Sequence, residues 1–298
     1  MLRRLAACFA TVLVLAGMLT LLNLAEPYLD DVQTKPTPQR IETYRVTPQR
    51  ALKVHVYEPP SQSGDPARPA IVFFYGGGWH GGDIAQFRDQ SAALADLGII
   101  AICAEYRVKQ VDNTTPFDAL SDALHAVAWV RANAEELGID PHRLAVGGGS
   151  AGAHLAAACA TVPDDQLANV AHDLPASPRP DALVLFNPVI DNGPTDTGYG
   201  HERIGDAYTW FSPAHNVRPG LPPTLIMLGT NDHLVPVSVA HDFRGAMHTH
   251  GNLCEIELYE GQPHGFFNNQ PGKEPMFQVT LQRTIDFLRK HGWIEAEN

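Results

Sequence analysis

The stretch RLAVGGGSAGAHLAAA, from Arg143 to Ala158, passes from one sequence pattern to another around a single serine. It begins as an apolar run typical of a buried strand, and it ends as an alanine-rich run typical of a helix. Between the two, residues 148–152 form the pattern G-x-S-x-G, with Ser150 at its centre. A strand, this motif and then a helix predict a tight turn that exposes the serine oxygen at the edge of a sheet.

The glycine-rich turn admits two interpretations. In the first, Ser150 is a nucleophile, and the N–H of Ala151 points into the same space at the start of the following helix. In the second, the glycines form a phosphate-binding loop. The second is disfavoured because the chain contains no G-x-x-x-x-G-K-[ST] motif. We therefore predict that Ser150 is a nucleophile.

A serine hydroxyl is a weak nucleophile unless a base removes its proton. The stretch GQPHGFF follows a predicted strand at 254–259 and presents His264 on a loop, which argues against a core histidine. The stretch LGTNDHLVPV follows a predicted strand at 224–229 and presents Asp232, whose alternative role is to cap a helix. The chain order Ser150, Asp232, His264 is the order of an α/β-hydrolase triad.

An acyl-transfer site also needs hydrogen-bond donors for the negative oxygen that forms during the reaction. The stretch FFYGGGWHGGD carries consecutive glycines after a predicted buried strand at 70–75. Their N–H groups can turn toward one point because no side chains obstruct them. Each such donor typically contributes about 3 kcal/mol to lowering the barrier. The alternative is that these glycines only form an ordinary turn, but such a turn would account for one glycine rather than for three consecutive ones.

Strands and helices alternate along residues 50–298, which predicts an α/β fold with a mostly parallel central sheet and helices on both faces. A Gly-, Pro- and aromatic-rich stretch at about 191–220 lacks helical periodicity and is interpreted as a small lid over the carboxyl edge of the sheet. The expected strands are 51–58, 70–75, 99–105, 143–148, 182–186, 224–229 and 254–259. The expected helices are 83–98, 116–138, 151–161, 237–250 and 275–291.

On these motifs the sequence resembles the α/β-hydrolase superfamily over roughly residues 50–291, in the branch of carboxylesterases and hormone-sensitive-lipase-like enzymes. Bacterial feruloyl and acetyl xylan esterases belong to that branch. The resemblance implies that Gly77 and Gly78 supply oxyanion N–H groups together with Ala151. The motifs that carry it are Tyr75–Trp79, Glu105–Arg107, Gly148–Ala153, Gly229–Pro236 and Pro263–Phe266.

The resemblance also implies that Glu105 and Arg107 form a structural turn and take no part in the chemistry. The sequence departs from the family at Tyr75, where a histidine usually steadies the glycine loop. Trp79 and Phe266 are candidates for lining an acyl or aromatic pocket, although core packing explains them equally well. In the predicted lid, the sequence YGHERIG places Glu202 and Arg203 on what we interpret as a solvated charged loop.

The first 25 residues differ from the rest of the chain. A basic start, MLRR, precedes an uncharged apolar run, so residues 1–25 are interpreted as a signal peptide or a membrane anchor. Polar, proline-containing residues 26–49 are interpreted as a linker, and residues 50–298 as the catalytic domain. We therefore expect the catalytic domain to be exported and to be periplasmic, secreted or membrane-anchored, with membrane contact only through the N-terminal segment.

Composition narrows the possible partners. The 298 residues are 44% hydrophobic, enough for a sizeable core, and the formal net charge of −12 argues against nucleic acid. No compact set of Cys, His and carboxylates has metal-ligand spacing, so neither a metal nor a cofactor is expected. Three cysteines downstream of the leader lie among apolar neighbours and are interpreted as buried free thiols: Cys103, Cys159 and Cys254.

These observations predict a serine hydrolase that cleaves short acyl or aromatic carboxylic esters, as small molecules or on a polysaccharide, through an acyl-enzyme. Two alternatives stay open. The same triad serves lactone or amide hydrolases, and hydrolase-like folds also occur as non-catalytic membrane-tethered binding proteins. Such binding proteins tend to lose triad members, whereas all three candidates are present here.

Overall fold

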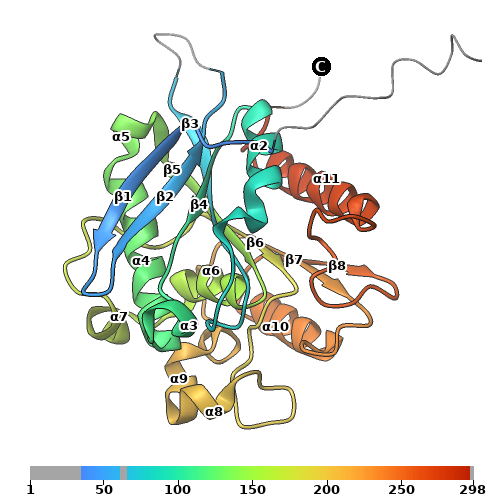
Figure 1. Ribbon diagram of the computed structural model, residues 1–298. Coiled ribbons are helices and arrows are strands. Elements are labelled where there is room, and N and C mark those ends of the chain that lie inside the picture. Colours follow the sequence, from blue (N-terminus) through green and yellow to red (C-terminus); the bar gives the residue numbers. More distant parts are fainter. Residues whose placement is uncertain (1–34, 61–65, 296–298) are drawn as a thin grey trace, which may run out of the picture. The chain divides into compact units, whose positions relative to one another are not determined.

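The computed structural model describes residues 35–60 and 66–295 (Figure 1). The predicted leader, 1–25, lies outside the described residues. Residues from Thr37 onward form one compact unit built on a single sheet with the strand order β1-β2-β4-β3-β5-β6-β7-β8. Its strands are β1 (Arg40–Val46), β2 (Ala51–Tyr57), β3 (Arg68–Phe74), β4 (Ile100–Ala104), β5 (Ile139–Gly149), β6 (Ala182–Phe186), β7 (Thr224–Gly229) and β8 (Cys254–Tyr259).

The sheet is antiparallel at one edge and parallel elsewhere. β1 pairs antiparallel with β2, and β2 pairs antiparallel with β4. All neighbours from β4 to β8 are parallel. Helices cover both faces of the central strands, so β4 and β6 are apolar along their whole length, and β4, β6 and β7 are buried at every position. The predicted α/β fold with a mostly parallel sheet is confirmed.

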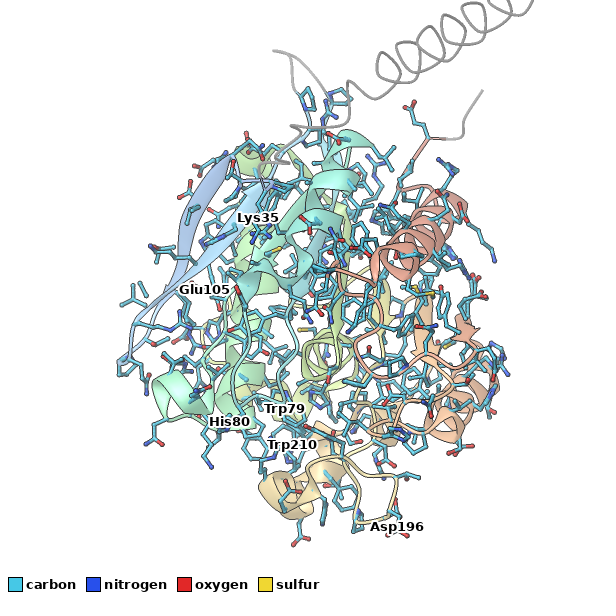
Figure 2. The ribbon with its side chains drawn as sticks, turned by 45° about the vertical axis from the view of Figure 1, so that its right-hand side comes forward. Lys35, Trp79, His80, Glu105, Asp196 and Trp210 are labelled. Atoms are coloured by element: carbon cyan, nitrogen blue, oxygen red, sulfur yellow. The ribbon has the colours of Figure 1, made fainter. Side chains whose placement is uncertain are left out.

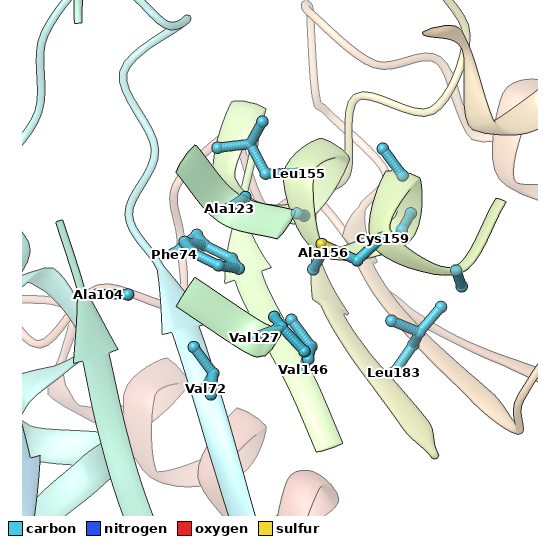
Figure 3. Close-up of a cluster of buried hydrophobic side chains, with 14 of the residues drawn as sticks. Val72, Phe74, Ala104, Ala123, Val127, Val146, Leu155, Ala156, Cys159 and Leu183 are labelled. Carbon is cyan, nitrogen blue, oxygen red and sulfur yellow. The ribbon is translucent and has the colours of Figure 1, made fainter. Parts of the chain in front are cut away.

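Helices pack on the two faces of the sheet and bury two apolar clusters. One cluster lies beneath α4 (Pro116–Ala132), α6 (Ala151–Thr161) and α10 (Val237–Thr249). The other lies beneath α2 (Arg88–Asp96) and α11 (Glu274–Lys290). Figure 3 shows the first cluster, where Phe74 and Val146 of the sheet meet Val127 of α4 and Leu155 of α6. The burial of α6 on all sides explains why its sequence is made of small residues.

Several element boundaries differ from those expected. The predicted helix 116–138 is divided at Asn133, whose side-chain amide donates to the Trp129 carbonyl (2.8 Å) and ends α4 before α5 (Ala134–Leu137). The predicted helix 83–98 begins as a 3-10 turn, η1 (Ile84–Phe87), which the Asp83 side chain caps. Two short helices were not anticipated, α3 (Lys109–Asp112) and α7 (Asp164–Val170). The chemically important boundaries, at the carboxyl ends of the strands, lie where expected.

The predicted linker over 26–49 is wrong in its second half, because β1 occupies residues 40–46 and extends the sheet beyond β2. Its side chains tie it to the body of the fold. The hydroxyl of Tyr44 donates to the Glu105 carbonyl (2.6 Å), and Arg45 forms an ion pair with the fully buried carboxylate of Asp122. The catalytic unit therefore begins before residue 50.

Glu105 and Arg107 stabilise the turn after β4. Arg107 donates through Nε (2.8 Å) and Nη2 (3.0 Å) to the two oxygens of Asp122, which lies on α4. Glu105 accepts from Arg50 (2.6 Å) and from the N–H of Lys53 (3.1 Å) on β2. These bonds join the antiparallel edge of the sheet to α4, which supports a structural role for this turn.

The region predicted as a lid contains short helical turns and no strand among its described residues. These turns are α8 (His201–Ile204), η2 (Gly205–Ala207), α9 (Tyr208–Phe211) and η3 (Pro213–Asn216). Figure 1 shows α8 and α9 together at one end of this unit, beyond α6 and α10. The chain enters the lid from the end of β6 and returns to the sheet through β7.

Candidate active site

The site lies where the parallel strands end. Phe74, the last residue of β3, pairs with Gly148 of β5, and Gly149 pairs with Phe186, the last residue of β6. Gly229 and Tyr259, which end β7 and β8, are also paired. Because the carboxyl ends of parallel strands share one edge, the loops after these five strands come together there.

Ser150 lies on the turn between β5 and α6 in a strained backbone conformation, with φ 54° and ψ −119°. A non-glycine residue adopts such angles only where its surroundings enforce them, and here the N–H of Ser150 donates to the Phe186 carbonyl (2.9 Å). Gly152 permits the turn, since a Cβ there would lie 2.1 Å from the Phe74 carbonyl oxygen. The sequence motif thus has the backbone geometry that was expected of it.

The three predicted triad side chains form one continuous hydrogen-bonded relay. Ser150 Oγ lies 2.9 Å from His264 Nε2, and His264 Nδ1 lies 2.7 Å from Asp232 Oδ2. A carboxylate can only accept, so Nδ1–H donates to Asp232 and leaves Nε2 as the acceptor for the Ser150 hydroxyl. The imidazole therefore has the tautomer that a general base for Ser150 requires.

The Asp232 carboxylate is fully buried yet stays ionised. Burial alone raises its pKa, but hydrogen bonds from His264 and from the N–H groups of Leu234 (2.8 Å) and Val235 (3.0 Å) outweigh this and hold the pKa below its usual value. A stable negative charge at this point orients the imidazole and stabilises its charged form. The alternative interpretation, a helix cap, is wrong, because the N-cap of α10 is Pro236 and no side chain caps this helix.

Asn187 is a site residue that the sequence did not single out. It follows β6, is fully buried, and has a left-handed backbone with φ 35°. Its Oδ1 accepts the N–H of Gly265 (3.0 Å), and this bond fixes the orientation of the amide. The amide nitrogen Nδ2 then faces His264 Nε2 at 3.3 Å. An asparagine directly after a strand that ends beside Ser150 is the only sequence signal that could have revealed it.

The glycine loop after β3, which the sequence predicts to be an oxyanion loop, contains backbone angles that favour glycine. Gly77 and Gly78 have φ values of 128° and 62°, and a Cβ on Gly77 would lie 2.2 Å from the Gly81 carbonyl oxygen. None of the hydrogen bonds among the described residues uses the N–H of Gly77, Gly78 or Ala151. Three unpaired donors at the edge where Ser150 lies are the arrangement that a developing oxyanion needs.

Other side chains hold this loop in the absence of the usual histidine. Tyr75 and Tyr106 stack at 4.2 Å and exchange hydrogen bonds, each hydroxyl donating to the other's carbonyl at 2.9 and 2.7 Å. Gln86 accepts the N–H of Gly76 (2.7 Å) and donates to Asn268 (2.9 Å). Asn268 in turn donates to the Gly265 carbonyl (2.8 Å), so this chain of bonds connects the glycine loop with the histidine loop.

A pocket of about 360 Å³ opens beside Ser150 and His264. Its walls come from the glycine loop, the histidine loop and the lid, and include His80, Tyr199, Leu234 and Phe267. Trp79 and Phe266, which were considered as pocket residues, are not among those that line it. Both are almost fully buried, and each packs behind the wall, Trp79 against Phe211 and Phe266 against Tyr259. In Figure 2, Trp79 and His80 lie at the end of this unit that carries the lid residue Trp210.

Arg203 differs from its expected role as part of a solvated loop. It starts on the lid helix α8 and turns into the pocket, where Nη1 donates to the Gly78 carbonyl (2.6 Å). Its guanidinium lies 5.1 Å from the ring centre of Trp79 and 5.4 Å from that of Tyr199. The lid is therefore joined directly to the oxyanion loop.

Within residues 35–60 and 66–295, no group of three or more His, Cys, Asp or Glu side chains is placed to hold a metal ion. No helix in this part of the chain is both long and apolar enough to cross a bilayer. Cys103, Cys159 and Cys254 are buried free thiols, as predicted.

Comparison with known families extends these observations. The BD-FAE family model matches residues 54–203, half of the chain, and the dienelactone hydrolase family model matches residues 208–292. An ethyl acetate hydrolase from Pseudomonas putida is 34% identical over 82% of this chain and 74% of its own length. The chain belongs to the α/β-hydrolase carboxylesterase family.

Solved structures of this family agree with the fold. The propionate-bound esterase Est2 of Thermogutta terrifontis superimposes with a TM-score of 0.80 and 38% identity, covering 87% of this chain and 96% of that one. A probable carboxylic ester hydrolase, LipM, from Mycobacterium tuberculosis is 30% identical over 65% of this chain. The chain spans about half the length of LipM and of the isoprenylcysteine alpha-carbonyl methylesterases of Arabidopsis thaliana and Oryza sativa that it also matches.

Proposed function

We propose that this protein hydrolyses carboxylic esters through an acyl-enzyme formed on Ser150. The observation that carries the proposal is the unbroken relay from Ser150 through His264 to Asp232, at 2.9 and 2.7 Å. His264 takes the Ser150 proton as the hydroxyl attacks the ester carbonyl, and the N–H groups of Ala151, Gly77 and Gly78 donate to the oxygen on which negative charge forms. His264 then protonates the leaving alcohol and later activates the water that releases the acid.

The acid part of the substrate is proposed to be short. A pocket of about 360 Å³, shared between both sides of the ester, lies at the small end of ligand sites. The similar esterase Est2 has been solved with propionate and with butyrate bound, which supports short acyl groups here. We also propose aromatic acyl groups, and acetyl groups on a polysaccharide, as substrates. Residues 1–25 are proposed to direct export, which would place the catalytic unit outside the cytoplasm.

A lactone is a second candidate substrate, because the dienelactone hydrolase model matches the residues that carry Asp232 and His264. Hydrolysis of a lactone uses the same steps, with the leaving alcohol still attached to the acyl group. An ester panel of rising chain length, assayed beside a lactone, acetylated xylan and methyl ferulate, would separate these substrates. A preference for long acyl chains would contradict the proposal of a short acyl group.

Covalent labelling tests the mechanism. A fluorophosphonate probe is expected to modify Ser150 in the folded protein, and Ser150→Ala is expected to abolish both labelling and ester turnover. The expected loss is on the order of a millionfold, because the serine and the histidine act as one unit. A non-catalytic binding protein would not be labelled. Retention of most turnover by Ser150→Ala would refute the assignment of this nucleophile.

A further inference from the structure

The pocket beside Ser150 carries a charge of the opposite sign to that of the whole protein. The sequence has 33 Asp and Glu residues and a formal net charge of −12. Nevertheless, none of the residues that line the pocket is acidic. The basic groups on its wall are Arg203, His80 and His264, and Tyr199 adds a neutral phenol. Because its wall has a guanidinium and no carboxylate, the pocket favours anions although the protein as a whole is acidic.

Arg203 is held in one orientation before any ligand arrives. The rings of Trp79 and Tyr199 lie within 5.4 Å of its guanidinium, and the Gly78 carbonyl accepts from Nη1 at 2.6 Å. An arginine whose side chain is already ordered loses little conformational entropy when it binds a ligand. Its planar donor fork also matches the two oxygens of a carboxylate better than an ammonium group does.

Part of this donor set remains available. Nη1 is bonded to Gly78, and Nε donates to Glu202 (3.1 Å), whose side chain is 74% exposed. Such an exposed ion pair contributes little energy, so it does not neutralise the guanidinium inside the pocket. Among the described residues, no hydrogen bond uses Nη2 of Arg203. That group can therefore take an anionic oxygen from a substrate held at Ser150.

We propose that Arg203 binds a free carboxylate of the substrate, and that the preferred esters carry this carboxylate a few bonds from the scissile carbonyl. Half-esters of short dicarboxylic acids and acyl esters of short hydroxy acids both belong to this class. The inference rests on the proposed esterase function and adds to it the charge of the substrate. The alternative is that Arg203 serves only to hold the oxyanion loop through Gly78.

Matched pairs of substrates separate the two roles. Monomethyl glutarate carries the free carboxylate in the acid part of the ester, and it is paired with methyl 5-oxohexanoate, a neutral ketone of the same shape. 3-Acetoxypropanoate is paired with 4-acetoxybutan-2-one, which places it in the alcohol part. Proton release in a pH-stat gives kcat/KM for each substrate with the wild type, Arg203→Met and Arg203→Lys.

The ratio of kcat/KM for the anionic and neutral members of a pair is the readout. We expect a ratio of roughly tenfold or more for the wild type in at least one pair, and a fall to near or below one in Arg203→Met. Arg203→Lys keeps the charge and should be intermediate. Loosening of the oxyanion loop slows both members alike, so it cancels in the ratio. Added salt should lower the wild-type ratio by screening the charge.

A matched control is Arg218→Met. Arg218 donates to the carbonyls of Thr161 and Ala160 and does not line the pocket, so its loss should leave the ratio unchanged. Two results would overturn the inference, provided that the protein still cleaves p-nitrophenyl acetate. One is a ratio in Arg203→Met equal to that of the wild type, and the other is a wild-type preference for the neutral substrates. Failure to cleave any ester, including p-nitrophenyl acetate, would instead overturn the proposed function, and the inference with it.

Discussion

At the scale of single residues, Asn187 gives the histidine a second neighbour on the side where catalysis occurs. Gly265 donates to Oδ1 and so forces the amide nitrogen toward His264 Nε2. The amide competes there with the Ser150 hydroxyl for the lone pair of Nε2. Asp232 accepts from the opposite ring nitrogen and so fixes the ring. Asn187 therefore acts on the same ring nitrogen that takes the Ser150 proton in the proposed reaction.

Replacement of the amide by a carboxylate tests this role. Asn187→Asp keeps an acceptor for the Gly265 N–H but replaces the donor that faces Nε2 by an oxygen, which can only accept. That oxygen can bind the Nε2 proton that the proposed reaction passes to the leaving alcohol, so we expect kcat/KM to fall by roughly tenfold or more. Asn268→Ala is the control, because Asn268 bonds to the same loop without touching the ring, and it should lower kcat/KM by less. Equal kcat/KM values for Asn187→Asp and the wild type would contradict this role.

At the scale of elements, α6 carries a titratable group that the proposed reaction does not use. His154 is fully buried, stacks on Phe211 at 4.3 Å and donates to the Phe211 carbonyl (3.2 Å). Burial lowers the pKa of His154 to about 3, although the bond to Phe211 partly opposes this shift. The ring therefore stays neutral in the folded protein, whereas it gains a proton in the unfolded chain below about pH 6.5.

The titration of His154 makes the free energy of unfolding depend on pH. Between about pH 6.5 and pH 3 the unfolded state binds a proton that the folded state does not, so stability falls as the pH falls. From pH 6.5 to pH 5 His154 should account for a loss of about 2 kcal/mol in the free energy of unfolding. His154→Gln retains a donor for Phe211 and removes this loss. Urea unfolding of both proteins at the two pH values measures it, and equal losses would show that His154 does not titrate in this way.

The sequence was sufficient to predict that Ser150, Asp232 and His264 come together, because each lies in a loop that directly follows a strand. Local chemistry is sufficient at Ser150, where the backbone is strained and glycines stand at positions 148, 149 and 152. Asn187 and Arg203 depend instead on tertiary contacts. The position of Arg203 is determined by two rings and a carbonyl from other parts of the chain, so within α8 it resembles any charged surface residue.

The same reasoning explains the errors in the fold. The alternation in RIETYRV predicts a strand, but the neighbouring prolines led us to interpret this segment as part of a linker. For Trp79 a pocket position and core packing were equally compatible with the sequence, and the structure has the second: with a φ of 57° its side chain is buried against Phe211. Backbone conformations of this kind are not visible in a sequence pattern.

At the scale of the whole molecule, the boundary of the catalytic unit can be tested by truncation. A chain that begins at Thr37 retains β1 and should keep its melting temperature and ester turnover. A chain that begins at Arg50 loses β1, the Tyr44 bond to Glu105 and the Arg45 ion pair with Asp122. We expect its melting temperature, measured by circular dichroism, to fall by roughly 10 °C or more. Equal melting temperatures for the two chains would show that β1 adds nothing to stability.

The paired tyrosines beneath the glycine loop have a consequence for acid tolerance. Burial raises the pKa of Tyr75 and of Tyr106 far above neutrality, so neither phenol gains or loses a proton in ordinary surroundings. An imidazole has a basic nitrogen that can take up a proton in acid, whereas a phenol has none. With tyrosine there, the stacked pair that supports the glycine loop has no protonation step of its own in a mildly acid medium.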